Sequence, residues 1–277
     1  ARLTYDAVQA VHDGTATAAD IGIAPAIYDN LAGAWQALGI ARAHREPLAL
    51  NLKERRVVLD DGGTPVAISK RAQSESQRLI EDFMIAANVA AAKTLINAGR
   101  PCVFRVHDMP DPEKTEGLRD LAQAVGAKLA RGQVLRPHHF NSILDHVRDS
   151  DDETMVNEAV LRSQSKAIYA VENIGHFGLA LQHYAHFTSP IRRYSDLLVH
   201  RALVDAAATK QTKDGLGAAD LASLAEDCTH ISETETRAAG AERRTIDRFA
   251  SALFADETGN VVSGVIAGLT GAGAFVS

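Results

Sequence analysis

The stretch from Thr188 to Arg201 constrains the fold of this chain more than any other segment. It reads Thr-Ser-Pro-Ile-Arg-Arg-Tyr-Ser-Asp-Leu-Leu-Val-His-Arg. Thr188 or Ser189 can cap a helix, and Pro190 suits the first helical position, where a missing N–H costs nothing. Apolar residues follow at helical spacing. The segment therefore predicts a helix that begins at Pro190 and extends to about Ala208.

Two arginines, Arg192 and Arg193, occupy the first turn of this predicted helix. The helix macrodipole is already positive there, so each cation costs several tenths of a kcal/mol. Free N–H groups at a helix start and guanidinium groups both bind phosphate, so a bound anion would offset that cost. The alternative is an exposed turn with two solvated arginines. Four flanking residues favour the anion site: His186, Tyr194, Asp196 and His200.

The composition indicates a soluble globular protein. A chain of 277 residues with 46% hydrophobic and 23% charged residues can form one large domain, or one domain and a fragment. No apolar run reaches the roughly 18 residues that span a bilayer, and the N-terminus lacks a signal pattern. The only cysteines, Cys102 and Cys228, are far apart, which argues against a disulfide framework and a zinc site. We therefore expect a cytoplasmic protein.

The net charge of −6 counts mildly against a nucleic-acid-binding protein, but it allows a locally positive channel. The chain starts at Ala1 rather than at Met and ends in an apolar strand pattern at Ser277, so we expect a piece of a longer polypeptide.

Hydrophobic periodicity predicts a helix-rich chain with a few strands. The expected helices cover residues 4–12, 25–44, 74–99, 112–125, two segments after 139 that an acidic loop at 149–153 separates, 190–208 and 221–254. The expected strands cover residues 48–70 around a turn at 60–63, 102–106, 167–170, 176–181 and the segment after 261. The change of pattern near residues 256–260 predicts a domain boundary there.

Two adjacent carboxylates on the helix over 74–99, Glu81 and Asp82, are candidates for a binding site. Neighbouring helical side chains point about 100° apart, so at most one of them faces a given site. One solvated carboxylate and one helix ion pair form an equal alternative. Asn88 stands among alanines, and a polar amide on a tightly packed helix needs a partner.

Arg105 and His107 share one face of a predicted strand, which suits a phosphate or sugar contact. They could equally satisfy an acidic helix end, and both interpretations stay open. Tyr5 and Tyr194 are candidates for stacking on bases, a contact that contributes about 1–3 kcal/mol per base. A tyrosine is more often a half-buried core residue, so neither tyrosine alone indicates a binding site.

The acidic string from Asp149 to Glu153, with Asp145, is a candidate for two-metal chemistry, which needs several converging carboxylates. It lies between two predicted helices and has no apolar flank to orient it. We therefore interpret it as a solvated loop and helix N-cap, and we expect no metal site in this chain.

Taken together, these motifs resemble the catalytic (RNB) domain of the ribonuclease II / ribonuclease R family. The motifs that carry the resemblance are Leu3-Thr4-Tyr5-Asp6, Leu79-Ile80-Glu81-Asp82-Phe83-Met84 through Asn88, Arg105-Val106-His107, Leu161-Arg162-Ser163, Glu172-Asn173-Ile174-Gly175-His176-Phe177-Gly178-Leu179, and His186-Phe187-Thr188-Ser189-Pro190-Ile191-Arg192-Arg193-Tyr194 with Asp196, His200 and Arg201. The end of the chain, from Gly264 to Val276, resembles the first strands of an OB-fold more weakly. The resemblance implies an α+β, helix-rich domain over residues 1–257 and the start of an OB-fold RNA-binding domain over 258–277.

The resemblance further implies a processive 3′-to-5′ exoribonuclease that hydrolyses single-stranded RNA to nucleoside 5′-monophosphates with Mg²⁺. Arg192 would stabilise charge on the scissile phosphate as the catalytic arginine. Tyr5 would stack on the terminal bases, and Glu81 would hold the 3′ nucleotide. Glu242 falls where the family has an acidic residue near the RNA 3′ end. With the residue-based candidates, the predicted RNA-binding set is Tyr5, Glu81, Asn88, Arg105, His107, Arg193, Tyr194 and Glu242.

In that family the aspartates that bind the metal lie upstream of the Leu-Thr-Tyr-Asp segment, which is where this chain begins. We therefore expect Mg²⁺ to be held by the intact parent enzyme and not by this chain, and the chain alone not to hydrolyse RNA. The expected partner is single-stranded RNA, with no membrane and a monomeric state. Two alternatives are a non-catalytic RNA-binding module of the same fold and a helical scaffold whose arginine turn binds a protein carboxylate.

Overall fold

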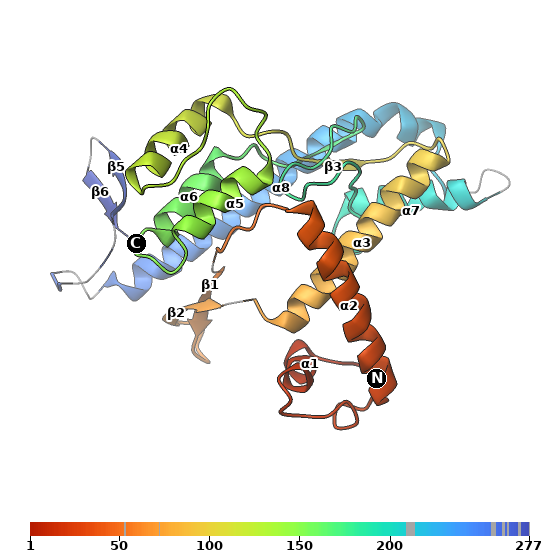
Figure 1. Ribbon diagram of the computed structural model, residues 1–277. Coiled ribbons are helices and arrows are strands. Elements are labelled where there is room, and N and C mark those ends of the chain that lie inside the picture. Colours follow the sequence, from red (N-terminus) through yellow and green to blue (C-terminus); the bar gives the residue numbers. More distant parts are fainter. Residues whose placement is uncertain are drawn as a thin grey trace.

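The computed structural model is rich in helix and contains three small antiparallel strand pairs (Figure 1). It describes residues 1–52, 54–71, 73–208, 214–255, 259–261, 264, 266–270 and 273–276. The helices are α1 (Tyr5–His12), α2 (Pro25–Arg45), α3 (Glu75–Asn97), α4 (Pro112–Ala124), α5 (Pro137–His146), α6 (Glu153–Ser163), α7 (Tyr194–Ala207) and α8 (Ala218–Leu253). The strands are β1 (Glu54–Leu59), β2 (Pro65–Arg71), β3 (Phe104–Val106), β4 (Ile168–Ala170), β5 (Ile266–Thr270) and β6 (Gly273–Val276). The predicted helix-rich α+β class is confirmed.

Helix α3 begins at a serine cap, Ser74. The Ser74 hydroxyl accepts a hydrogen bond from the Gln77 N–H at 3.3 Å, and the Gln77 side chain accepts one from the Ser74 N–H at 2.9 Å. This reciprocal capping box satisfies two N–H groups that a helix start otherwise leaves unpaired. The helix ends before Gly99, whose φ of 60° suits a glycine.

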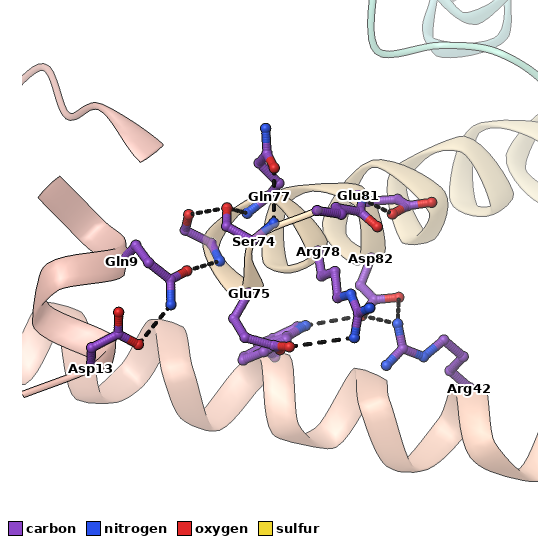
Figure 2. A network of polar contacts seen from close by, with 12 residues as sticks. Gln9, Asp13, Arg42, Ser74, Glu75, Gln77, Arg78, Glu81 and Asp82 are labelled. Carbon is purple, nitrogen blue, oxygen red and sulfur yellow. Dashed lines mark hydrogen bonds and ion pairs between the residues drawn. The ribbon is translucent and has the colours of Figure 1, made fainter. Parts of the chain in front are cut away.

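Helices α1 and α2 both pack against the first turns of α3 (Figure 2). From α1, the Gln9 side-chain oxygen accepts a hydrogen bond from the Ser76 N–H at 3.0 Å. From α2, the Trp35 indole N–H donates to Asp82 at 2.9 Å, and Arg42 forms an ion pair with the same carboxylate at 3.1 Å. These contacts hold the N-terminal segment, and with it Tyr5, against one end of α3.

The larger hydrophobic core lies where α3, α7, α8 and the β3–β4 pair meet. In that pair Phe104 lies opposite Ala170, and Arg105 lies opposite Tyr169. Fully buried members of this core include Ala92, Leu95, Ala185 and Val199. This core fixes the segment between β4 and α7, which carries the sequence motif with the two arginines.

A second core lies between α4, α5 and α6, on the other side of the molecule in Figure 1. Phe140, Ile143, Val156 and Val160 are fully buried in it. Phe177, from the loop after β4, packs against this core. The loop that carries Phe177 therefore joins the two cores.

Several predicted elements differ in the structure. Residues 48–52, expected as part of a strand, are in none, and α5 begins at Pro137 rather than after residue 139. Residues 176–181, expected as a strand, form a turn that the isolated bridge between His176 and Leu181 closes. Helix α7 begins at Tyr194 rather than at Pro190, and residues 190–192 form a separate turn before it. The N–H groups of Arg192 and Arg193 both donate to the Ser189 carbonyl, which closes that turn.

The acidic loop also differs in one detail. Asp152 is the N-cap residue of α6 by position, but its side chain makes no capping hydrogen bond. Asp149, Asp151 and Asp152 are exposed, as a solvated loop requires.

At the C-terminal end, β5 and β6 form an antiparallel pair. The predicted domain boundary near residues 256–260 falls partly on residues 256–258, which lie outside the described part of the chain. The assignment of residues 258–277 to an OB-fold stays a prediction. Among the described residues, no helix combines the length and the apolar character that crossing a bilayer requires.

Candidate nucleic-acid interface

A pocket of about 230 Å³ lies between α1, α3 and the segment that precedes α7. One face of α3 forms its floor, because residues spaced by three or four positions share a helix face. The lining residues are Tyr5, Gln77, Ile80, Glu81, Met84, Ile85, Asn88, Leu179, Tyr184 and Arg193. The pocket thus has an apolar floor with an aromatic ring, a carboxylate and a guanidinium around it. Four residues of the predicted RNA-binding set meet here: Tyr5, Glu81, Asn88 and Arg193.

Asn88 has the partners that its position among alanines required. Its side-chain N–H donates to the Tyr184 hydroxyl at 3.0 Å, and its oxygen accepts a hydrogen bond from the Phe187 N–H at 2.9 Å. The side chain is only 2% exposed. Asn88 therefore ties the segment before α7 to the floor of the pocket, while its contact with RNA stays a prediction.

The two adjacent carboxylates of α3 have different surroundings. Asp82 is 5% exposed and points toward Arg42 and Trp35 on α2, whereas Glu81 is exposed on another side of α3 and lines the pocket (Figure 2). The Gln73 side chain donates to Glu81 at 2.6 Å. Of the two, Glu81 is thus the carboxylate available to a ligand in the pocket.

The arginine turn, residues 189–193, is organised around Asp196. This carboxylate is fully buried, and its oxygens lie 2.8 Å and 2.9 Å from the Arg193 nitrogens Nε and Nη2. It also accepts hydrogen bonds from the Ser189 N–H at 2.8 Å and the Ser195 hydroxyl at 3.2 Å. The expected cationic first turn of the helix is therefore wrong. The first turn of α7 holds a buried acid, and the arginines precede it.

Arg192 lies at the surface of this turn, and Ile191 beside it is fully exposed. Arg193, in contrast, is half-buried between Asp196 and the pocket. Arg192 is thus accessible from solvent.

Arg105 pairs with the long helix α8. Its two terminal nitrogens lie 2.6 Å and 3.1 Å from the two Glu235 carboxylate oxygens, and its guanidinium lies 4.6 Å from the centre of the Tyr169 ring. Glu235 lies midway along α8, so this ion pair is not the contact with an acidic helix end that the sequence analysis considers. A role of Arg105 in RNA binding is untested.

His107 is buried, and both of its ring nitrogens have partners in the backbone. Nε2 lies 2.9 Å from the Ser165 carbonyl, and Nδ1 accepts a hydrogen bond from the Gly178 N–H at 2.9 Å. Burial lowers the pKa of His107, and the Ser165 hydrogen bond opposes that shift. The imidazole is thus neutral, and both of its nitrogens are hydrogen-bonded to the backbone. Its contact with RNA stays a prediction.

Two further histidines near the pocket are held neutral. Burial, with His107 and Arg105 nearby, lowers the pKa of His176 to about 3. Burial, with Arg193 and Arg105 nearby, lowers the pKa of His186 to about 3. His186 also hydrogen-bonds the Tyr169 hydroxyl at 2.9 Å. Both arginines are themselves paired with carboxylates, Arg193 with Asp196 and Arg105 with Glu235.

The remaining candidates do not line the pocket. Tyr194 is the first residue of α7 and is 47% exposed, and Glu242 is exposed on α8. Sequence reasoning missed Tyr184, Gln77 and Leu179 as pocket residues. The signal for Tyr184 was Asn88, which needed a partner.

Within the described ranges, no three or more His, Cys, Asp or Glu side chains come together as a metal site. Two buried carboxylates already pair with arginines, Asp196 with Arg193 and Asp82 with Arg42. Glu81 alone does not supply the several carboxylates that a magnesium site needs. The residues described here therefore do not fit a Mg²⁺ ion.

Comparison with known proteins decides the family. The model of the RNB domain matches residues 1–209. The chain belongs to the RNB domain family. Ribonuclease R of Escherichia coli is 35% identical over 284 aligned positions, which cover 100% of this chain and 35% of the relative. Ribonuclease R of Aquifex aeolicus is 39% identical over 226 positions, covering 82% of this chain and 32% of the relative.

This RNB chain spans about a third of the length of these curated relatives. Among solved structures, Mycoplasma genitalium RNase R in complex with ribose-methylated single-stranded RNA matches it with a TM-score of 0.89 and 25% identity. The match covers 99% of this chain and 43% of that one. Yeast Ssd1, described as a pseudonuclease, shares the fold with a TM-score of 0.60 at 18% identity, over 83% of this chain and 28% of that one.

Proposed function

We propose that this chain is the part of a processive 3′-to-5′ exoribonuclease that holds the 3′ end of single-stranded RNA. The observation that carries the proposal is the convergence of Tyr5, Glu81 and Arg193 on one pocket beside the exposed Arg192. Single-stranded RNA is recognised by stacking on aromatic rings and by contacts with its backbone, for which this set is suited. Membership of the RNB domain family and likeness to ribonuclease R support the same assignment.

In the proposed complex, Tyr5 stacks on a base near the 3′ end, and Glu81 accepts hydrogen bonds from the terminal nucleotide. Arg192 contacts the phosphate and stabilises the charge that develops on it during hydrolysis. Arg193 and Asp196 keep the turn that carries Arg192 in place. Arg105, Tyr194 and Glu242 stay candidates for further contacts with the RNA, whereas the buried His107 would act on it only indirectly.

We infer that the reaction needs Mg²⁺ and that residues outside this chain hold the ion, because no described group of carboxylates here fits it. The chain alone then binds RNA without cutting it. The test compares this chain with a longer polypeptide that includes upstream RNB sequence, each mixed with a 3′-overhang RNA and magnesium. Release of nucleoside 5′-monophosphates is expected from the longer protein alone, and release by this chain would contradict the assignment.

The role of Arg192 is tested in the longer protein. The change Arg192→Ala should reduce turnover by about 100-fold or more, because it removes charge stabilisation from the transferred phosphoryl group. The matched control is Arg162→Ala, which removes an arginine from α6 that pairs with Glu158. Equal turnover in the Arg192→Ala and wild-type proteins would exclude the assigned role.

The second candidate function is a non-catalytic RNA-binding module. We consider it because yeast Ssd1, which is described as a pseudonuclease, has the same fold. It predicts RNA binding without hydrolysis in the longer protein as well. A scaffold whose arginine turn binds a protein carboxylate predicts no RNA binding. RNA affinity that falls with salt, with a logarithmic slope of about −0.7 per phosphate contact, excludes the scaffold.

The expected location is the cytoplasm, and the two cysteines support a reducing compartment because both are buried free thiols. The monomeric state stays a prediction.

A further inference from the structure

The loop from Gly175 to Leu181 forms one wall of the pocket, because Leu179 reaches into it. This loop has unusual backbone angles, with φ of 83° at Gly175 and 50° at Ala180. The His176 N–H donates to the Leu181 carbonyl at 2.8 Å, and the Leu181 N–H donates back at 3.2 Å. Such a tight turn needs partners for the N–H groups at its tip, since the turn leaves them pointing inward.

Two imidazoles supply these partners. The Gly178 N–H donates to His107 Nδ1 at 2.9 Å, and the Leu179 N–H donates to His176 Nδ1 at 3.2 Å. A backbone N–H can only donate, so both Nδ1 atoms are unprotonated acceptors. The proton of His107 is therefore on Nε2, which donates to the Ser165 carbonyl at 2.9 Å. The two rings lie edge to face, with centroids 5.0 Å apart.

The loop fits closely onto these rings. A Cβ atom at Gly178 would lie 2.9 Å from His107 Nδ1 and 3.1 Å from Cε1 of the same ring, which leaves no space for a side chain. On its other side the loop is held by α2 and the segment that follows it. The Arg45 Nε donates to the Leu179 carbonyl at 3.1 Å, and the Leu48 N–H donates to the Gly178 carbonyl at 2.8 Å.

We propose that His107 and His176 are positioning residues of the pocket, which hold the Gly178–Leu179 backbone so that Leu179 forms the wall against the RNA 3′ nucleotide. This role rests on the proposed function of the pocket. It also explains why His107 shares a strand face with Arg105 without reaching the surface: its ring acts on the RNA through the loop. Neither imidazole touches the ligand.

The test compares two substitutions at one position. His107→Phe keeps a flat ring beside Phe177 but loses both hydrogen bonds. His107→Asn keeps an oxygen acceptor near the position of Nδ1. The matched control is His146→Phe, which removes an imidazole that bonds the Val125 carbonyl at 3.1 Å beside the second core. Each protein is the full chain, and the probe is a fluorescein-labelled oligoadenylate.

Two measurements are made on each variant: amide hydrogen exchange at Gly178 and Leu179, and RNA affinity by fluorescence anisotropy. His107→Phe should speed exchange at the Gly178 amide and weaken RNA binding, each about tenfold, the factor expected for losing the one hydrogen bond that His107 makes to the loop. His107→Asn should restore most of both effects, and His146→Phe should change neither.

Unchanged exchange in His107→Phe would show that the imidazole does not hold the wall, and it overturns the inference whatever the RNA affinity. If the wild-type chain binds RNA, and His107→Phe exchanges faster but binds RNA with unchanged affinity, then the wall does not contribute to binding in the pocket. If Tyr5→Ala binds RNA as tightly as the wild-type chain does, that result contradicts the proposed function of the pocket. The exchange rates then still decide whether His107 holds the loop.

Discussion

Asp196 is the residue on which the geometry of the arginine turn depends. It is fully buried, and it accepts hydrogen bonds from Ser189, Ser195 and Arg193. Removing one partner of a buried ion pair leaves the other charge uncompensated, which costs about 3–5 kcal/mol. Asp196→Ala should therefore lower the free energy of unfolding, measured by urea denaturation, by about 3 kcal/mol.

The control for this prediction is Glu235→Ala. Glu235 also pairs with an arginine through two oxygens, but its side chain is 42% exposed, so its loss should cost less than about 1 kcal/mol. Equal losses in the two variants would show that burial does not set the importance of Asp196.

The buried histidines make stability depend on pH. The pKa of His176 and that of His186 are each lowered from 6.5 to about 3, first by burial and then by neighbouring cations such as Arg105 and Arg193; Asp196 opposes the shift at His186. Below pH 6.5 the unfolded chain therefore binds protons that the folded chain does not, and stability falls. Each imidazole adds a slope of at most about 1.4 kcal/mol per pH unit between pH 6.5 and about 3.

Thermal unfolding between pH 7.5 and 4.5 measures this effect. A double variant, His176→Gln with His186→Gln, should lose most of the pH dependence. A wild-type unfolding temperature that is constant over this range would show that neither imidazole is held neutral by the fold.

Sequence reasoning could identify several site residues but not their surroundings. Asn88 among alanines correctly indicated a buried amide with a partner, although the partner, Tyr184, is distant in sequence. His107 looked like a surface contact because strand alternation places it beside Arg105. Which nitrogen meets which backbone group depends on a loop 71 residues away, which no local pattern can reveal.

At the scale of helices, α3 directs two neighbouring carboxylates to different surroundings: Asp82 packs against α2, and Glu81 lines the pocket. Asp82→Ala should destabilise the fold by about 3 kcal/mol, because it leaves the Trp35 indole and Arg42 without their shared partner. Glu81→Gln should leave stability within about 0.5 kcal/mol of wild type, since the side chain is exposed.

For RNA affinity the order of the two variants should be reversed, with Glu81→Gln the more damaging change. Glu81→Gln is expected to weaken affinity for a 3′ nucleotide by about three- to tenfold, since it removes a charged acceptor from the pocket. Urea denaturation and fluorescence anisotropy measure the two effects separately. Loss of stability in Glu81→Gln, or none in Asp82→Ala, would reverse the assignment of the two carboxylates.

Helix starts show where local patterns mislead. The start of α3 follows a local pattern, because Ser74 and Gln77 are close in sequence and satisfy each other. The start of α7 was placed four residues early, because Pro190 has a favourable local pattern. Asp196 decides the outcome: its side chain reaches back to the Ser189 N–H, closes a separate turn and leaves Arg193 as the N-cap residue. Local helix propensity does not predict a helix start when a buried carboxylate seven residues away binds the backbone there.

At the scale of the whole molecule, periodicity predicted most helices and the hairpin of β1 and β2, and thus the α+β class. It could not predict that the helices divide between two cores. It also could not predict that the loop with Phe177 and Leu179 joins one core to the pocket, because that arrangement depends on contacts between distant segments.

The central claim is that the pocket between α1, α3 and the arginine turn binds the 3′ end of single-stranded RNA. The most direct measurement is the affinity of the full chain for a fluorescein-labelled oligoadenylate, with wild-type, Tyr5→Phe and Tyr5→Ala proteins compared at constant salt. Loss of one base stack should weaken binding by about 5- to 150-fold in Tyr5→Ala. Tyr5→Phe, which keeps the ring, should bind as wild type does. Equal affinities of the wild-type and Tyr5→Ala proteins would contradict the account.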